Sequence, residues 1–147
     1  MDKVDKVDKV DKAHKVLVVD DEVDILSTVK LYLKDKYEVL TAENARDALL
    51  LVESEKPAVI ITDIKMPGMS GIELMRRVKS KENNDAEILV ITGHGDMETA
   101  VEAVRLGAVD FLVKPIDTKR LKLAVKRALE KAEMKRGILE YIDEVYG

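Results

Sequence analysis

The sequence has no cysteine and no tryptophan among its 147 residues, and it has a single phenylalanine. The lack of cysteine excludes disulfide bonds, thiolate zinc sites and cysteine nucleophiles. Aromatic residues make up only 3% of the chain, which argues against a nucleic-acid surface built on base stacking. The absence of cysteine also agrees with a reducing, cytoplasmic location.

Long apolar runs are missing as well. No segment approaches the roughly 18 apolar residues that a membrane span requires. Met1 is followed by alternating Asp and Lys, not by the apolar core of a signal peptide. We therefore expect no membrane association. The net charge of −4 disfavours direct nucleic-acid binding by this chain, because such binding needs a concentrated basic face.

The composition that remains is that of one globular domain, with 46% hydrophobic and 37% charged residues. The first twelve residues repeat Asp-Lys-Val, and a period of three suits neither a helix nor a strand for long. We expect residues 1–13 to form a flexible, solvated tail.

After the tail, short apolar runs alternate with stretches in which apolar residues recur every three or four positions, and these patterns predict buried strands and helices respectively. The expected strands cover residues 15–20, 37–41, 58–63, 87–92 and 109–113. The first two expected helices cover residues 23–34 and 44–55, and the next two lie near 72–78 and 97–104. A last helix is expected to begin at residue 117 or 118. Asn44 and Asp96 are expected to cap helices, and Gly107 to end one. The alternation predicts a parallel sheet with helices on both faces.

The run from Ala58 to Asp63 is the centre of this pattern, because it ends abruptly in a carboxylate followed by a Pro/Gly-rich loop. Ligands of open parallel sheets bind outside the carboxyl ends of the strands. The other strands end in polar residues too: Asp20 and Asp21, Thr92, and Lys114. We expect all of these side chains to meet at one edge of the sheet.

Together these groups favour phosphoryl chemistry. Three carboxylates at close range repel one another unless a cation binds them, and Mg²⁺ takes oxygen ligands and bridges carboxylates to phosphates. Lys114 adds a fixed positive charge, and the hydroxyl of Thr92 can donate to an oxyanion. An ionised Asp63 between these charges is a nucleophile aimed at phosphorus.

Each residue also has a simpler interpretation. Asp21 or Glu22 could cap the first helix, Thr92 could simply end a strand, and Lys114-Pro115 could be an ordinary turn. Their occurrence at successive strand ends of one α/β chain favours the shared site.

Four segments that hold these residues resemble the response-regulator receiver domain of two-component signalling. They are VVDDE at 18–22, DIKMPGMSG at 63–71, ITG at 91–93 and GAVDFLVKP at 107–115. The resemblance covers roughly residues 14–132, and ITGHGD at 91–96 is similar to receivers of transcriptional activators. It implies a flavodoxin-like, doubly wound, five-stranded parallel sheet of order 2-1-3-4-5.

The resemblance implies that Asp63 accepts a phosphoryl group from a sensor histidine kinase or a phosphotransfer protein. It implies Mg²⁺ held by Asp21, Asp63 and the backbone carbonyl of Lys65, with Asp20 helping through water. The chain would then be a signalling switch rather than a turnover enzyme. Its phosphoryl signal would be recognised on the face made by its fourth helix, fifth strand and fifth helix.

Other matching positions are expected to act in the conformational switch or to set the lifetime of the phosphoryl group. The resemblance makes Thr92 the switch hydroxyl, Lys114 the phosphate-contacting lysine before a cis proline, and Phe111 an aromatic ring that fills the space Thr92 leaves. Simple core packing is the alternative for Phe111. Lys65 and His94 lie two positions after Asp63 and Thr92, where the family tunes dephosphorylation.

Two other functions share parts of this pattern. A Mg²⁺-dependent aspartyl phosphohydrolase of the haloacid-dehalogenase type needs a second Asp two residues after the first, and Lys65 occupies that position. A receiver-like interaction module that is never phosphorylated does not need the intact acidic set with Thr92 and Lys114.

Residues 133–147 extend the helical pattern beyond the receiver. Ile138, Ile142 and Val145 share one face, and Gly137 interrupts the pattern at a cost of roughly 1 kcal/mol. The segment is either a helical linker that forms a homodimer or an extra turn that packs back on the receiver. The alternative expectation is a homodimer through the face of the fourth helix, fifth strand and fifth helix.

Overall fold

The computed structural model describes residues 11–81 and 84–147 of the chain. Within these residues, strands and helices alternate as the sequence predicts. The strands are β1 (Asp11–Val19), β2 (Tyr37–Ala42), β3 (Val59–Asp63), β4 (Glu87–Thr92) and β5 (Asp110–Val113). The helices are α2 (Val23–Leu33), α3 (Ala45–Glu55), α4 (Gly71–Ser80), the short 3₁₀ helix η1 (His94–Asp96), α5 (Met97–Arg105) and α6 (Thr118–Tyr146).

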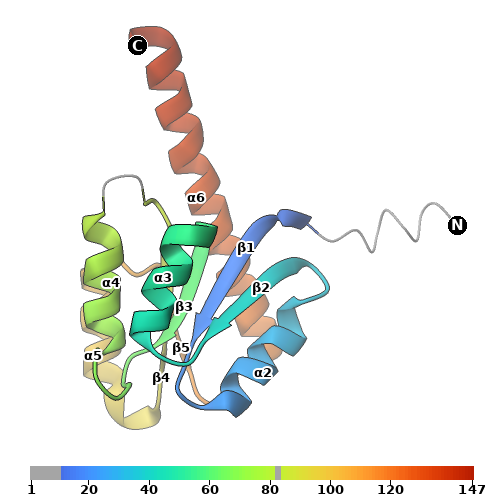
Figure 1. Ribbon diagram of the computed structural model, residues 1–147, viewed down its shortest axis with the longest axis vertical. Helices are drawn as coiled ribbons and strands as arrows, with labels where there is room; N and C mark the ends of the chain where they lie inside the picture. Colours follow the sequence, from blue (N-terminus) through green and yellow to red (C-terminus); the bar gives the residue numbers. More distant parts are fainter. Residues whose placement is uncertain (1–10, 82–83) are drawn as a thin grey trace, which may run out of the picture.

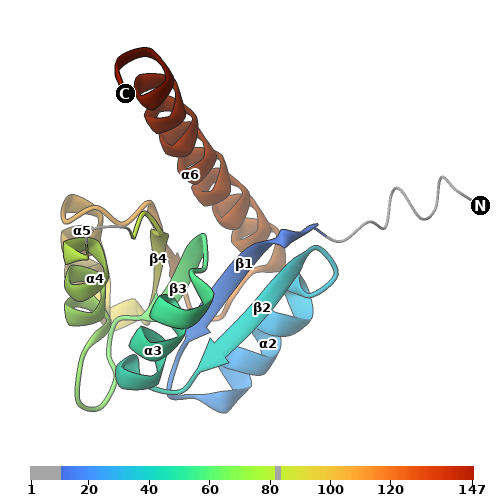
Figure 2. The same cartoon turned by 45° about the horizontal axis from the view of Figure 1, so that its top comes forward.

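The strands form one parallel sheet in the order β2-β1-β3-β4-β5, which confirms the predicted doubly wound topology (Figure 1). Helices α2 and α6 bury their apolar residues against one face of the sheet. Helices α3, α4 and α5 cover the other face, as the rotated view in Figure 2 also shows. Two apolar layers therefore hold the sheet between them.

The central strands are continuous apolar runs because both of their faces are covered. Every residue of β3 and of β4 is buried. Ile60 belongs to the layer under α3 and α4, whereas Val59 and Ile61 belong to the layer under α2 and α6. This packing fixes the register of β3, and with it the position of Asp63 at its carboxyl end.

Most of the predicted helix boundaries are confirmed. The side chain of Asn44 accepts the N–H of Asp47 at 2.8 Å and caps α3. Asp117 caps α6 by accepting the N–H of Arg120. Gly107 follows α5 with a positive φ of 117°, a conformation that favours glycine.

Two local predictions differ from the structure. Strand β1 begins at Asp11 instead of Lys15, with Asp11 paired to Tyr37 and an irregular register before Lys15. Pairing of backbone groups needs no apolar pattern, so the apolar periodicity does not predict this extension of the strand. Residues 1–10 of the expected tail lie outside the described residues. Asp96 makes no capping hydrogen bond to α5, and its carboxylate is instead paired with Lys65.

Helix α6 is longer than the receiver pattern requires. It runs for 29 residues and continues through Gly137 without a break. Its C-terminal part projects away from the sheet (Figures 1 and 2) and does not pack back on the domain. None of the described helices is apolar enough over a sufficient length to cross a bilayer.

Two glycines should respond in opposite ways to the same substitution. A Cβ at Gly71 would overlap the backbone carbonyl of Asp63, whereas a Cβ at Gly137 would meet open space. We expect Gly71→Ala to lower the free energy of unfolding by about 1–3 kcal/mol, and Gly137→Ala to raise it by about 0.5–1 kcal/mol. Chemical denaturation of both variants provides the measurement, and equal values would contradict the close packing at Gly71.

Candidate functional site

The parallel register brings the predicted polar residues to one edge of the sheet. Thr62 of β3 pairs with Val19 of β1, and Thr92 of β4 pairs with Val113 of β5. Asp20 and Asp21 follow β1, Asp63 ends β3, Thr92 ends β4 and Lys114 follows β5. In Figure 1 this edge lies at the lower end of the sheet, where the arrowheads point.

Three carboxylates lie close together at this edge. One carboxylate oxygen of each of Asp20, Asp21 and Asp63 lies within 4.8 Å of the others. Asp20 is fully buried and Asp63 is 7% exposed, whereas Asp21 faces solvent. Oδ1 of Asp20 accepts the N–H of Glu22 at 2.8 Å, but its buried Oδ2 accepts no hydrogen bond from the described residues. An all-oxygen set with a buried oxygen that lacks a well-directed hydrogen bond suits a hard cation.

One lysine balances part of this negative charge. The ammonium of Lys114 lies 3.4 Å from Oδ2 of Asp63, 3.3 Å from Oδ2 of Asp20 and 3.1 Å from Oε1 of Glu22. The peptide bond between Lys114 and Pro115 is cis. From the sequence, Glu22 is expected only as a possible helix cap. It occupies the N-cap position of α2, but its side chain makes no capping bond.

The electrostatics follow from burial and these contacts. Burial raises the pKa of Asp20 to about 6, although the N–H of Glu22 and the charge of Lys114 oppose the change. Burial also raises the pKa of Asp63, again against the effect of Lys114. Burial alone would lower the pKa of Lys114, but Glu22, Asp20 and Asp63 raise it. The lysine stays charged, and the buried acids remain undercompensated.

The two predicted switch residues lie on neighbouring strands. The hydroxyl of Thr92 is buried and donates to the carbonyl of Gly93 at 3.0 Å. Phe111 pairs with Val90 in the sheet, two residues along β4 from Thr92. Its ring is half-buried against the core, and the guanidinium of Arg120 lies 6.0 Å from the ring centroid. The core packing expected as the simpler role of Phe111 is therefore present.

Lys65 lies at the mouth of the site. Its backbone N–H donates to Oδ1 of Asp63 at 3.4 Å, and its ammonium lies 2.7 Å from Oδ1 of Asp96. Asp96 raises the pKa of Lys65 through this contact. The partnership with Asp96 was missed because a spacing in sequence does not show which two loops meet. The side chain of His94 lies outside the part of the chain that the structure describes.

Comparison with known proteins agrees with this geometry. The response regulator receiver domain family matches residues 16–126. The chain belongs to this family. The nitrogen assimilation regulatory protein NtrX of Azorhizobium caulinodans is 39% identical over 130 residues, which cover 86% of this chain and 28% of NtrX. Sporulation initiation phosphotransferase F of Bacillus subtilis is 34% identical over 116 residues, which cover 78% of this chain and 93% of that protein.

Solved structures of receivers share the fold. A response regulator receiver domain protein from Clostridium thermocellum has a TM-score of 0.76 at 35% identity, covering 82% of this chain and 98% of that one. The receiver domain of NtrX from Brucella abortus has a TM-score of 0.74 at 41% identity, covering 78% and 98%. The chain thus spans a whole receiver domain but less than a third of NtrX from Azorhizobium caulinodans.

The raised pKa of Asp20 gives a testable pH dependence. Its folded pKa of about 6 exceeds the ordinary value of 3.8, so the folded state binds more protons in this window. Stability contributed by protonated Asp20 is therefore lost as pH rises through about 6. Without divalent cations, we expect Asp20→Asn to be more stable than the wild type above this pH, by roughly 2–3 kcal/mol.

The measurement is the free energy of unfolding against pH in chelator-treated buffer. Asp24→Asn, which removes an exposed acid from α2, serves as the matched control and should follow the wild type. A wild-type curve parallel to that of Asp20→Asn would contradict the burial argument.

Proposed function

We propose that this receiver domain accepts a phosphoryl group on Asp63 from the phosphohistidine of a sensor histidine kinase or of a phosphotransfer protein. The observation that carries the proposal is the environment of Asp63. Its carboxylate is 7% exposed, lies 3.4 Å from the Lys114 ammonium, and is within 4.8 Å of two further carboxylates. A carboxylate in this position, at the carboxyl edge of a parallel sheet, is where such sheets bind their ligands, which supports a role as the acceptor.

The proposed cofactor is Mg²⁺, held by Asp20, Asp21, Asp63 and the backbone carbonyl of Lys65. The donor set contains only oxygen atoms, and Asp20 contributes to it a buried carboxylate whose Oδ2 accepts no well-directed hydrogen bond from the described residues. When bound, Mg²⁺ neutralises charge on the phosphoryl oxygens during transfer.

Each remaining residue has a role in the transfer. A carboxylate oxygen of Asp63 forms a bond to phosphorus while the bond from phosphorus to the imidazole nitrogen of the donor breaks, and that nitrogen keeps the electron pair. Lys114 is already within 3.4 Å of Asp63, so its ammonium can contact the new phosphoryl oxygens. The hydroxyl of Thr92 exchanges its bond to the carbonyl of Gly93 for a bond to the phosphoryl group.

The signal is then read on the face made by α5, β5 and α6, which are the fourth helix, fifth strand and fifth helix of the sequence prediction. Movement of Thr92 changes the loop before α5, and Phe111 follows on β5. A local charge thereby biases a two-state loop and helix. Lys65 and His94 are proposed to tune dephosphorylation, and the Lys65–Asp96 ion pair supports such a role for Lys65. The domain acts as a switch and not as a turnover enzyme.

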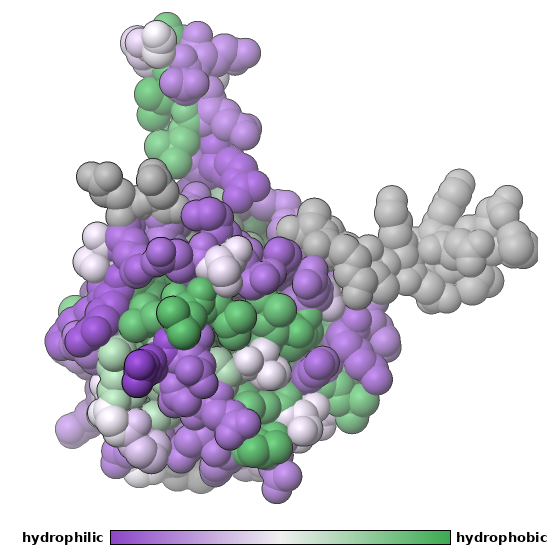
Figure 3. All heavy atoms as spheres, viewed as in Figure 1, coloured by the Kyte–Doolittle hydropathy of each residue, from purple (hydrophilic) through white to green (hydrophobic). Residues whose placement is uncertain are grey.

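We also propose that the projecting part of α6 forms a homodimer. Its exposed apolar residues are Met134, Ile138, Leu139, Tyr141, Ile142, Val145 and Tyr146. Figure 3 shows apolar residues along one side of this part of the helix. A helix gains no stability from exposing such residues to water, and a second copy would cover them. The alternative dimer surface is the face of α5, β5 and α6, where Met97, Val101 and Val104 of α5 are exposed.

The proposed compartment is the cytoplasm, which the family match supports. The chain itself is not proposed to bind nucleic acid, because its net charge is −4 and such binding requires a basic face.

Incubation with a small phosphodonor and Mg²⁺, followed by intact mass measurement, tests the acceptor. We expect one stoichiometric adduct that is stable in acid and labile in base. Asp63→Asn should lose the adduct, whereas Asp35→Asn, an exposed acid after α2, should keep it. The same mass before and after incubation of the wild type would refute the proposal.

In the same assay, Lys65→Ala and His94→Ala should change the half-life of the adduct but not its stoichiometry. An unaltered half-life would exclude the tuning role.

The dimer is tested by light scattering of the 147-residue chain with and without a phosphoryl mimic. We expect a dimer mass in at least one state, and a monomer mass in both states for Ile138→Ser/Ile142→Ser. Leu123→Ser, which changes an exposed leucine on the part of α6 beside the sheet, is the control and should dimerise. A monomeric wild type in both states would count against the proposal.

A further inference from the structure

A second buried carboxylate lies at the opposite end of the sheet from Asp63. Glu87 is the first residue of β4 and is fully buried. Its strand neighbours Ile88 and Leu89 are apolar and equally buried. Neither carboxylate oxygen of Glu87 accepts a well-directed hydrogen bond from the residues that the structure describes. A buried charge of this kind is costly unless opposite charges lie against it.

Lysines from α6 supply that compensation. The ammonium of Lys135 lies 2.7 Å from one oxygen of Glu87, and the ammonium of Lys131 lies 3.8 Å from the other. The two lysines are four residues apart, so they extend from the same side of the helix. The carboxylate is thus held by one face of α6.

A third lysine reaches the same cluster from α4. Burial lowers the pKa of Lys79, Glu87 opposes this change, and the charges of Lys135 and Lys131 add to it. The aliphatic part of the Lys79 side chain packs against Gly107, where an added Cβ would lie 3.2 Å from Cε of Lys79. Glu87 therefore lies among positive charges from helices on both faces of the sheet.

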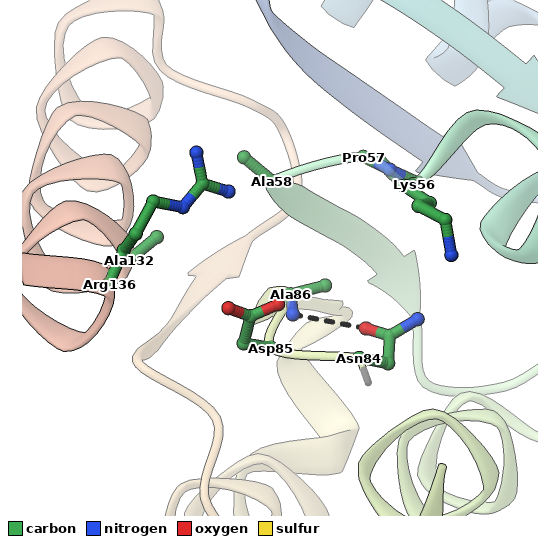
Figure 4. A pocket seen from close by; sticks show the side chains of 8 residues that line it. All are labelled: Lys56, Pro57, Ala58, Asn84, Asp85, Ala86, Ala132 and Arg136. Carbon is green, nitrogen blue, oxygen red and sulfur yellow. Dashed lines mark hydrogen bonds between the residues drawn. The ribbon is translucent and has the colours of Figure 1, made fainter. Parts of the chain in front are cut away.

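The cluster lies where α6 leaves the domain. The last buried residue of α6 is Leu129, and the helix continues to Tyr146 as an exposed rod. In the helical turn that follows Leu129, the carboxylate of Glu133 lies 3.1 Å from the imidazole of His14 on β1. Ala132 and Arg136 face Ala58 and the segment 84–86 across a pocket of about 230 Å³ (Figure 4). An open pocket lies on that side, so apolar packing does not hold this turn as it holds the helix before Leu129.

From these observations we propose that Glu87 is a buried ionic anchor that fixes the direction in which α6 leaves the receiver domain. Its carboxylate attaches the turn containing Lys131 and Lys135 to the first residue of the central strand β4. Without that charge, the buried apolar packing of α6 ends at Leu129, and the exposed contact between Glu133 and His14 still ties this turn to β1. The helix beyond Leu129 is then less restrained and can tilt over the pocket. The proposal does not depend on phosphorylation of Asp63.

Pulsed electron paramagnetic resonance measures the direction of the helix directly. The chain has no cysteine, so spin labels attach only at introduced ones. Labels at Arg76→Cys on α4 and Glu140→Cys on α6, both exposed, report the distance from the domain to the rod. Dilution with unlabelled protein removes contributions from a second copy. We expect a narrow distance distribution in the labelled parent and a broadened, shifted one after Glu87→Gln.

Matched variants separate the anchor from general destabilisation. Glu53→Gln removes an exposed carboxylate that is paired with Lys81 at 3.1 Å, and the distribution should stay narrow. Lys135→Met should broaden the distance distribution, whereas Lys135→Arg, which keeps the positive charge, should leave it as narrow as in the labelled parent. Circular dichroism establishes that each variant is folded. If Glu87→Gln fails to fold, Lys135→Met decides the outcome. An unchanged distribution in folded Lys135→Met or folded Glu87→Gln would overturn the proposal.

Discussion

The repulsion among acidic groups at the carboxyl edge of the sheet is the constraint on which the site depends. Asp20, Asp21 and Asp63 cannot move apart, because the register of β1 and β3 fixes where each strand ends. Burial withholds from Asp20 and Asp63 the water that would otherwise screen them. Lys114 supplies one positive charge, and Glu22 shares it. The edge is consequently suited to bind a further positive charge.

The parts of the fold that depend on apolar patterns could be predicted from the sequence. The continuous runs of β3 and β4 required a sheet covered on both faces, and the polar residue at the end of each run then required a shared edge. The partners of Glu22 and Asp96 could not be predicted in this way. Those contacts join loops from different strands, and their geometry depends on side-chain directions that no periodicity encodes. The early start of β1 escaped prediction for a related reason, since backbone pairing with Tyr37 leaves no mark on composition.

Strand β4 joins two acidic environments of different character. At one end Thr92 lies at the edge of the sheet that carries the three carboxylates, and at the other end Glu87 lies among lysines. The run between them is fully buried and apolar, so neither end is screened from the other by water within the domain. The same strand thus carries the proposed switch hydroxyl and the proposed attachment of the outgoing helix.

The unbroken course of α6 through Gly137 has a mechanical consequence. From Arg136 to Tyr146 the helix rises about 15 Å at roughly 1.5 Å per residue, and all of its residues over this length are exposed. A tilt of about 10° at its base would move the tip by about 3 Å, given that rise. A rearrangement too small to disturb the core would become, at the far end of the rod, a displacement comparable to the width of a side chain.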